Sequence, residues 1–395
     1  MPNKTAIIGA GASGLISAVF LGRKNIPVTI FEKNSKVGRK LLTTGNGRCN
    51  ITNTHICVDN FHCTDPEFVK YPINAFDYNS CKKFFNEIGI EFTQGAKNRI
   101  YPMSLTASSV VDLLEYECIK NNVNIQLDTQ VDKVEYKNGK YIINSKDSFD
   151  NVIVASGSIA MPKLGSSDTG YKIAQEFGHV IIEPFASLVQ LVSSNKNLDI
   201  ITGVKVDGII NGVQGDILFT KYGISGSAVL DISRDIAYEL QYNDEVNISI
   251  DTMPLFNRKK LSDILLKRAS QDPNKDIYLW LDGLMNKKLS RYIIQSSIDT
   301  KNIKQVKSIN RKDIQKIAHN IKNLQFTITD TKGFDSCEVC AGGVEVSNVN
   351  NKTMESKLQK GLYFTGEVLD VDGQCGGYNL HFAWASGYLA SKNIS

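Results

Sequence analysis

Three glycines and one acid near the start of the chain have the types and spacing that bind a dinucleotide. Gly9, Gly11 and Gly14 form a G-x-G-x-x-G turn, and Glu32 ends the apolar run that follows. Gly9 allows a tight turn, Gly11 lets backbone N–H groups approach a pyrophosphate, and Gly14 lets a helix pack closely on a strand. Glu32 would accept hydrogen bonds from a ribose diol. The alternative is a glycine-rich turn in an unrelated strand–helix joint.

The residues around these glycines predict the elements that such a site needs. Residues 4–8 are typical of a short strand, 15–21 of an apolar helix, and 28–31 of a second strand. The helix N-terminus would offer unpaired N–H donors and the positive end of its dipole to phosphates. Strand, glycine turn, helix, strand and acid follow in the order of a dinucleotide-binding βαβ unit.

A second group of residues near the C-terminus indicates which dinucleotide is bound. Residues 362–365 are typical of a strand that ends at Gly366 and Glu367, and residues 376–379 (GGYN) open a helix over 378–389. Many FAD domains use such a late strand–glycine–acid element to hold the ribityl chain, whereas NAD domains are usually continuous. The N–H groups of the last helix would face the O2/N1 edge of the flavin, where negative charge gathers on reduction. We therefore expect FAD, bound non-covalently by both ends of the chain.

Length and composition indicate a globular protein of two or three domains. The chain has 395 residues, of which 42% are hydrophobic and 22% charged. No apolar run approaches the ~18 residues of a membrane span, and the first strand begins too early for a signal peptide. The eight cysteines are then expected to be reduced thiols. These features predict a cytoplasmic protein without membrane contact, and they leave its oligomeric state open.

The order of periodicities predicts a Rossmann-like α/β domain that is interrupted by an insert. We expect an FAD-binding domain of the glutathione reductase-like type, formed by residues 1–186 and 333–395. Short alternating runs over 187–255 predict a β-barrel or sandwich, and helix periodicity follows over 256–322. Residues 323–332 would return as a strand to the β insert.

Several smaller elements are expected within the first part of the FAD domain. Asn138-Gly139 predicts a hairpin turn. The other expected elements are helices over 81–88 and 110–119, strands of a small meander over 124–127, 130–136 and 141–144, and a buried strand over 151–157.

Positive charge is concentrated in the helical part of the insert. Residues 256–322 contain sixteen Lys or Arg against six Asp and no Glu, a net charge of +10 in a chain whose total is +4. Tyr278, Trp280 and Tyr292 lie among these cations. The region is either a solvated helical face with a core of aromatic residues or a surface that holds RNA phosphates and stacks unpaired bases.

Five segments resemble one flavoprotein family. Residues 38–53 (GRKLLTTGNGRCNITN) and 361–387 (GLYFTGEVLDVDGQCGGYNLHFAWASG) are the most specific, and residues 155–170, 218–233 and 353–357 add to them in order. They resemble the BaiN/RdsA family, also described as aminoacetone oxidase-like FAD-binding enzymes or YhiN-type flavoproteins. The resemblance covers nearly the whole chain and implies the two-part FAD domain with a β-barrel and helical insert.

The resemblance also implies which residues contact FAD. The ADP half would be bound by Gly9, Gly11, Ala12, Ser13, Gly14, Glu32 and Lys33, with Val131 at the adenine and Ala155, Ser156 and Gly157 beside the nucleotide. The pyrophosphate and ring would be approached by Arg39, Lys40, Gly45, Gly47, Arg48, Cys49 and Asn50. The flavin end would be closed by Gly366, Glu367, Gly377, Tyr378 and Asn379.

Two positions depart from the family pattern. Asn46 stands where a third glycine is more usual, and Ser227 where proline is more usual. Asn tolerates left-handed backbone angles better than most residues, so the first change is mild. Ser227 lacks the fixed φ of proline, which would loosen its loop without removing it.

FAD would perform the redox step, and the protein would supply orientation and a proton partner. Only one dinucleotide fingerprint is present, so NAD(P)H would be a transient electron donor. The family implies three substrates: a uracil C5=C6 bond in 23S ribosomal RNA, giving dihydrouridine; an activated C=C bond of a steroid-like bile acid; or a small amine such as aminoacetone. The first is preferred because of the basic region, and a non-enzymatic FAD-containing RNA-binding protein is a further alternative.

Cysteine supplies the candidate proton donors. Cys49 lies in the 38–53 segment and Cys375 precedes the GGYN turn, and each is either a general acid or a buried small residue beside the cofactor. Cys337-x-x-Cys340 resembles a redox or metal pair, but no second cysteine pair or histidine lies nearby in the sequence, so no metal site is expected. His381 would either face the flavin or pack in the core.

Overall fold

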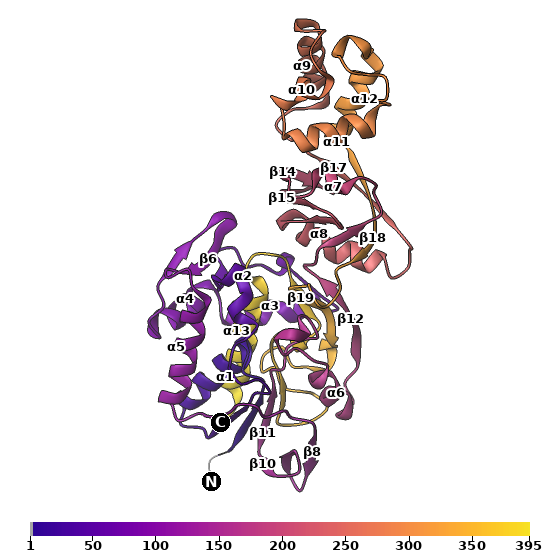
Figure 1. Cartoon of the computed structure of the whole chain (residues 1–395). Helices are drawn as coiled ribbons and strands as arrows, with labels where there is room; N and C mark the ends of the chain where they lie inside the picture. The colour runs from indigo at the N-terminus through magenta and orange to yellow at the C-terminus, as the bar shows by residue number, and fades with distance from the viewer. Residues whose placement is uncertain (1–2) are drawn as a thin grey trace. The chain divides into compact units, whose positions relative to one another are not determined.

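A computed structural model describes residues 3–395 of the chain, which form two compact units. The first, called the terminal unit here, consists of the chain up to Ala186 together with Phe334–Ser395. The second, called the insert unit, is Ser187–Gly333. Each unit has a hydrophobic core of its own. The chain thus leaves the terminal unit once and returns to it once (Figure 1).

The terminal unit is built on a five-stranded parallel sheet with the strand order β20-β11-β1-β2-β7. The central strand pairs in register with both neighbours, Thr5 with Asn151 and Thr5 with Val28. The strands are β1 (Thr5–Ile8), β2 (Val28–Phe31), β7 (Asn124–Gln126), β11 (Asn151–Val154) and β20 (Leu362–Phe364). The predicted opening strands, the buried strand near 151 and the late strand near 362 are therefore confirmed as neighbours in one Rossmann-like sheet.

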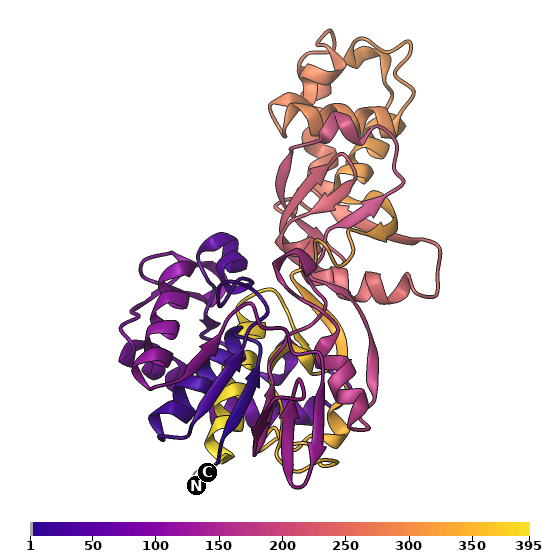
Figure 2. The same cartoon turned by 60° about the horizontal axis from the view of Figure 1, so that its bottom comes forward.

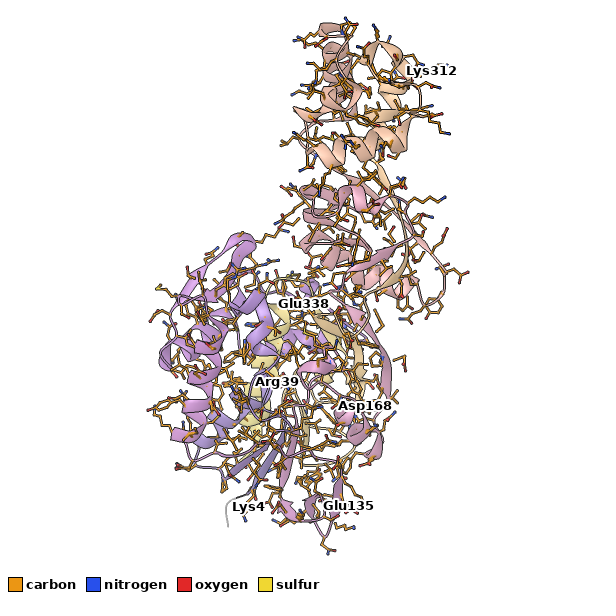
Figure 3. The ribbon with its side chains drawn as sticks, viewed as in Figure 1. Lys4, Arg39, Glu135, Asp168, Lys312 and Glu338 are labelled. Atoms are coloured by element: carbon orange, nitrogen blue, oxygen red, sulfur yellow. The ribbon has the colours of Figure 1, made fainter. Side chains whose placement is uncertain are left out.

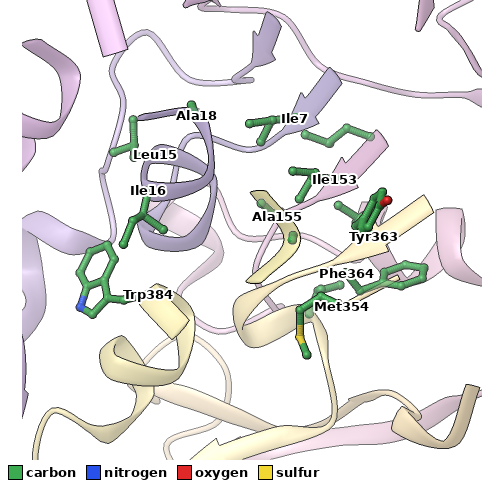
Figure 4. Packing of buried hydrophobic residues seen from close by; sticks show 14 of the residues in the cluster. Ile7, Leu15, Ile16, Ala18, Ile153, Ala155, Met354, Tyr363, Phe364 and Trp384 are labelled. Atoms are coloured by element: carbon green, nitrogen blue, oxygen red, sulfur yellow. The ribbon is translucent and has the colours of Figure 1, made fainter. Parts of the chain in front are cut away.

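Helices cover this sheet because its central strands are apolar on both faces, as in other parallel sheets. Ile7 and Ile153 have no exposed surface, and they pack near Leu15 and Ile16 of α1 (Ala12–Arg23). Figure 4 shows these side chains together with Trp384 of α13 (Tyr378–Asn393). The Trp384 indole N–H donates to the Ile51 carbonyl at 3.0 Å. The first and last helices therefore share one core.

The small meander differs from its prediction. Residues 124–127 are not part of it, because β7 pairs in parallel with β2 as the edge strand of the main sheet. An edge strand is exposed on one side, and its polar alternation resembles that of a hairpin strand. The turn at Asn138-Gly139 is confirmed, with φ of 52° and 79°. The meander itself consists of β8 (Val134–Lys137), β9 (Lys140–Ile143) and β10 (Asp147–Phe149).

Further helices and strands complete the terminal unit, in which the ends of the described chain meet. Asn3 Nδ2 donates to the Ser395 carbonyl at 2.8 Å, so the two ends of the described chain lie side by side (Figure 2). The remaining helices are α2 (Thr44–Gly47), α3 (Pro66–Ala75), α4 (Tyr78–Glu87), α5 (Ala107–Lys120) and α6 (Thr169–Glu176). The remaining strands are β3 (Thr52–Asn53), β4 (Phe61–Cys63), β5 (Phe92–Gln94), β6 (Arg99–Pro102), β12 (Ile181–Ser187), β19 (Val339–Val344) and β21 (Val371–Gly373).

The insert unit contains a closed barrel with the strand order β13-β16-β15-β14-β17-β18. The return strand, β18 (Leu324–Thr331), pairs antiparallel with β17 and β13, as the sequence predicts. The other strands are β13 (Leu191–Ser193), β14 (Lys205–Ile210), β15 (Val213–Thr220), β16 (Gly223–Ser225) and β17 (Val246–Asp251).

Two features of the barrel region depart from the sequence analysis. Within 187–255, the two short alternating runs at 203–206 and 208–213 suggest two separate strands, but they contribute to one strand, β14, and the chain turns at Asn211-Gly212, where both φ are positive. A helix, α8 (Ser227–Glu239), lies within the segment expected to be β, along with a short α7 (Leu198–Ile201). Val229, Ile232 and Ile236 of α8 are buried, and this helical spacing was hidden among the surrounding short strands.

The basic segment forms four helices whose first turns are each capped by an Asn or Asp side chain. Trp280 and Tyr292 are only 1% and 6% exposed. The alternative that these two rings stack on RNA bases is therefore wrong, because the core needs their apolar surface. The helices are α9 (Arg258–Gln271), α10 (Ile277–Asp282), α11 (Lys287–Ser297) and α12 (Arg311–Lys322).

Over residues 3–395, each helix falls short of the length or the apolar character that a bilayer crossing requires.

Candidate cofactor site

The glycine turn after β1 has the close packing expected of a dinucleotide site. A Cβ added to Gly14 would lie 2.0 Å from the Gly9 carbonyl oxygen, so only glycine fits there. Gly11 is the N-cap of α1 and has no side chain to bond the N–H groups of the first turn. A Cβ added to it would meet nothing within 4 Å. The first turn of α1 therefore presents its N–H groups to open space, as an anion site requires.

Glu32 lies at the end of β2 with only 7% of its surface exposed. Its Oε2 accepts the Ala10 N–H at 2.9 Å, and its Oε1 accepts the Asn34 backbone N–H at 2.9 Å and side-chain Nδ2 at 2.6 Å. These bonds fix the carboxylate beside the glycine turn. Asn34 has no part in the sequence motif, although it follows the acid by two residues.

One pocket brings the predicted adenosine residues together. Gly9, Glu32, Lys33, Val131 and Ser156 line it, although they come from four separate segments of the terminal unit. Sequence reasoning missed two groups of lining residues. Thr129 and Gln130 belong to a loop without a recognisable motif, and Gly165, Ser167 and Thr169 lie in the 155–170 segment but were not singled out within it. The open first turn of α1, the fixed acid and this pocket fit the ADP half of FAD.

The 38–53 segment contains α2 and β3, and two residues within α2 have left-handed backbone angles. Gly45 has φ 57° and ψ 33°, and Asn46 has φ 57° and ψ 47°, so the asparagine adopts the glycine-like conformation expected of it. Arg48 is exposed and its guanidinium lies 5.0 Å from the centre of the Tyr101 ring. Cys49, at φ 58°, has no exposed surface. Burial raises the pKa of its thiol to about 12, against a smaller opposite effect of the bond to Thr44.

Lys40 and Glu367 join the N-terminal loop to the C-terminal turn. Lys40 Nζ lies 2.7 Å from Glu367 Oε2. Glu367 Oε1 accepts the Ser158 hydroxyl at 2.9 Å and the Cys340 backbone N–H at 3.1 Å. Ser158 stands next to the predicted Ala155–Gly157 segment and was not singled out from the sequence. Glu367 is therefore a bonded and oriented carboxylate.

The N-terminus of α13 fits the pyrimidine edge of a flavin. Gly377 has φ 93°, and a Cβ there would lie 2.6 Å from the Thr52 carbonyl oxygen and 2.9 Å from Asn50 Oδ1. Asn50 Oδ1 is buried without a hydrogen-bond partner among the described residues. An unpartnered acceptor beside an uncapped helix N-terminus matches a ring edge that carries an N–H and carbonyl oxygens. The Asn379 amide instead holds the backbone of Gly373, at 2.8 and 2.7 Å.

Cys375 differs from Cys49 in its surroundings. It is partly exposed, and Arg99 Nη2 lies 3.4 Å from its Sγ and 3.3 Å from its carbonyl oxygen. Asn53 Nδ2 bonds the neighbouring Gly376 carbonyl at 3.0 Å. Arg99 was not found from the sequence, because β6 brings it to the site from outside every motif.

His381 packs in the core. It has no exposed surface, and its Nδ1 lies 2.8 Å from Thr52 Oγ1. Burial lowers the pKa of the ring to about 4, with smaller opposite effects from the Phe76 carbonyl and Asp77. Within residues 3–395 no three His, Cys, Asp or Glu side chains are grouped to hold a metal ion.

These elements define a Rossmann-like FAD-dependent oxidoreductase with an inserted barrel. Residues 3–393 match the family described as "HI0933-like protein Rossmann domain", and the chain belongs to that family. It is 35% identical over 406 residues to a 3-dehydro-bile acid delta(4,6)-reductase of Clostridium scindens, which covers 99% of this chain and 98% of the relative. It is 32% identical to a ribosomal RNA dihydrouridine synthase of Haemophilus influenzae, in a match that covers 100% of this chain and 98% of the relative. It is 30% identical to a ribosomal RNA dihydrouridine synthase of Escherichia coli, in a match that covers 98% of this chain and 97% of the relative.

Among solved structures, the chain is similar in fold to 3-ketosteroid delta1-dehydrogenase from Sterolibacterium denitrificans. The TM-score is 0.52 at 11% identity, and the match covers 99% of both chains. This likeness concerns the fold alone.

Proposed function

We propose that this protein is an NAD(P)H-dependent reductase that forms dihydrouridine in 23S ribosomal RNA. The observation that carries the proposal is the placement of charge on the helical part of the insert unit. Thirteen of the sixteen Lys and Arg residues between 256 and 322 are exposed, and Figure 3 marks one of them, Lys312. Exposed cations at this density bind polyanions by releasing counterions. Two full-length relatives are named for this reaction on ribosomal RNA.

The basic surface is supported by the packing beneath it. Leu265, Ile293 and Ile317 of α9, α11 and α12 have no exposed surface, so the apolar sides of these helices form their core. Of the three aromatic residues Tyr278, Trp280 and Tyr292, only Tyr278 is partly exposed. The Arg291 guanidinium lies 5.0 Å from the centre of its ring.

Reduction of a C=C bond needs a hydride at one carbon and a proton at its neighbour. FAD, when bound, supplies the hydride. With FAD bound, the first turn of α1 would hold the pyrophosphate and Glu32 would hold the ribose side. The Lys40–Glu367 pair joins the two halves of the site. Cys375 is the proposed proton donor, since it is partly exposed beside Arg99 whereas Cys49 is sealed in the core. NAD(P)H is proposed as the transient electron donor.

A small-molecule reductase is the second candidate, because the relative at 35% identity is named a 3-dehydro-bile acid reductase. An activated C=C bond conjugated to a ketone needs the same hydride and proton delivery. This candidate leaves the exposed cations without a role.

The two candidates are separated by deleting the gene and mapping dihydrouridine in 23S ribosomal RNA. We expect one modified position to disappear and to return when the gene is restored. An unchanged map, combined with NADPH oxidation by purified protein on a steroid enone, would favour the second candidate.

A charge-reversal series tests the docking surface. Changing Lys287, Lys288 and Arg291 to Glu should weaken ribosomal RNA binding at least tenfold and flatten its salt dependence. The matched control reverses three exposed lysines of the terminal unit, Lys82, Lys83 and Lys360, and should leave binding within twofold. Equal loss in both variants would mean that total charge, and not this surface, determines binding.

A further inference from the structure

Asn34 makes contacts in the cofactor site that the dinucleotide motif does not require. Glu32 Oε1 accepts two hydrogen bonds from Asn34, one from the backbone N–H at 2.9 Å and one from Nδ2 at 2.6 Å. Glu32 Oε2 accepts one, from the Ala10 N–H. An ionised carboxylate has about four acceptor sites, two on each oxygen. Asn34 therefore occupies Oε1, and Oε2 is the oxygen left to accept a ribose hydroxyl.

The oxygen of the same Asn34 amide binds an arginine. Asn34 Oδ1 accepts a hydrogen bond from Arg39 Nη1 at 2.8 Å, and Arg39 Nη2 donates to the Lys163 carbonyl oxygen at 3.2 Å. Arg39 is labelled in Figure 3. Both donors belong to one planar guanidinium, so they fix the spacing between Asn34 and the Lys163 carbonyl. The contacts of Asn34 thus run from the acid at the end of β2 to a segment far along the chain.

The segment that Arg39 reaches is a turn at the edge of the adenosine pocket. A short 3-10 helix, Pro162–Leu164, lies between Met161 at φ 58° and Gly165 at φ 101°. Gly165 lines the same pocket as Glu32. A Cβ added to Gly165 would lie 2.3 Å from Asn34 Nδ2, so the turn approaches Asn34 more closely than any side chain would allow. Asn34 is therefore in contact with two parts of the pocket wall.

We propose that Asn34 and Arg39 form a clasp that holds the 162–165 turn at a fixed spacing from Glu32, and that this spacing fits the adenosine half of FAD. Asn34 is a positioning residue, because it acts by orienting the Glu32 carboxylate and, through Arg39, the turn that carries Gly165. The inference rests on FAD occupying the pocket and is independent of the substrate.

The first test measures FAD binding to the apoprotein by titration with calorimetry. Asn34→Ala should weaken binding about tenfold, the effect of losing one hydrogen bond to a charged group. This change leaves the net charge of the site unaltered. Lys36→Ala removes an exposed cation from the same loop and should leave binding within twofold. An Asn34→Ala affinity within twofold of the wild type would overturn the proposal.

Arginine variants separate the clasp from simple attraction of the anionic cofactor. Arg39→Ala should also weaken FAD binding about tenfold. Arg39→Lys keeps the charge but cannot reach two acceptors with one planar fork, so it should be nearly as weak as Arg39→Ala. Wild-type affinity in Arg39→Lys would show that charge alone matters and would refute the clasp. Asn34→Ala/Arg39→Ala should lose little more than either single variant, whereas multiplied losses would mean two independent roles.

The second test follows the turn without any cofactor, by hydrogen exchange of the apoprotein and mass spectrometry. The Leu164 and Gly165 N–H groups donate to the Met161 and Pro162 carbonyls at 2.8 and 2.9 Å. In Asn34→Ala and in Arg39→Ala these amides should exchange at least fivefold faster, because the turn opens more easily once it is released. Amides of β1 should be unchanged. Equal exchange of the turn in wild type and both variants would contradict the proposal.

These tests are separable from the proposed function. No RNA, enone or NAD(P)H is added, so a wrong substrate or electron donor leaves every result unchanged. If the apoprotein took up no FAD, the proposed function would fail, and the exchange experiment would still decide whether the clasp exists. If Asn34→Ala does not fold, the two Arg39 variants test the same contacts.

Discussion

The burial of His381 predicts a specific pH dependence of stability in the terminal unit. The folded ring titrates at about 4, below its ordinary value of 6.5, because burial disfavours the charged form. The unfolded chain therefore binds the proton more tightly. The stabilisation that comes from burying the neutral His381 ring is complete above about pH 6.5, and it is lost as the pH falls toward 4. At about 1.4 kcal/mol per tenfold change in proton affinity, the free energy of unfolding drops by about 2 kcal/mol between pH 7 and pH 5.

The assay follows urea unfolding by tryptophan fluorescence at several pH values. The chain has two tryptophans, Trp384 in the terminal unit and Trp280 in the insert unit, so Trp280→Phe makes the signal specific to the terminal unit. In that background, the free energy of unfolding should drop between pH 7 and pH 5 by about 2 kcal/mol less in the His381→Gln variant than in its parent. His55→Gln, at an exposed position, should leave the loss unchanged. A His381→Gln variant that loses as much stability as its parent would refute the reasoning.

Three further outcomes are expected. Gly14→Ala should yield protein with little bound flavin, since the added methyl would lie 2.0 Å from the Gly9 carbonyl oxygen; flavin absorbance per protein measures this. Glu367→Gln should weaken FAD binding about fivefold, of order 1 kcal/mol for a partly exposed ion pair, as calorimetry would show. Phe326→Ala, at a fully buried barrel position, should destabilise the insert unit by about 3–5 kcal/mol, while Trp384 fluorescence reports unchanged unfolding of the terminal unit.

The parts of the fold that follow from local pattern were predictable. Gly9 and Gly14 are needed for the backbone geometry of the turn, and Glu32 is the acid that follows the second strand. Both requirements are visible in the sequence as fixed residue types at fixed spacing. The late strand and last helix also carry glycines that mark their ends. Helix α8 was missed because its apolar spacing competes with the alternation of the short strands beside it.

The site residues that escaped prediction are brought in by tertiary structure. Arg99 reaches Cys375 only because β6 pairs with β3 and β5. Ser158 and Asn34 act by holding the two carboxylates of the site, a role that depends on distance and not on spacing along the chain. Whether Trp280 is buried or exposed likewise depends on how four helices pack together.

The order in which the segments are made by the ribosome sets when each unit can assemble. All strands of the insert unit have been synthesised once residue 331 has been added, so the barrel can close early. The terminal unit waits for β20 beside β11 and for α13, whose Gly387 carbonyl accepts the Ser17 hydroxyl of α1 at 3.0 Å. Until then its nascent sheet lacks an edge strand and exposes apolar surface. We therefore expect FAD to bind only after β20 and α13 have been synthesised.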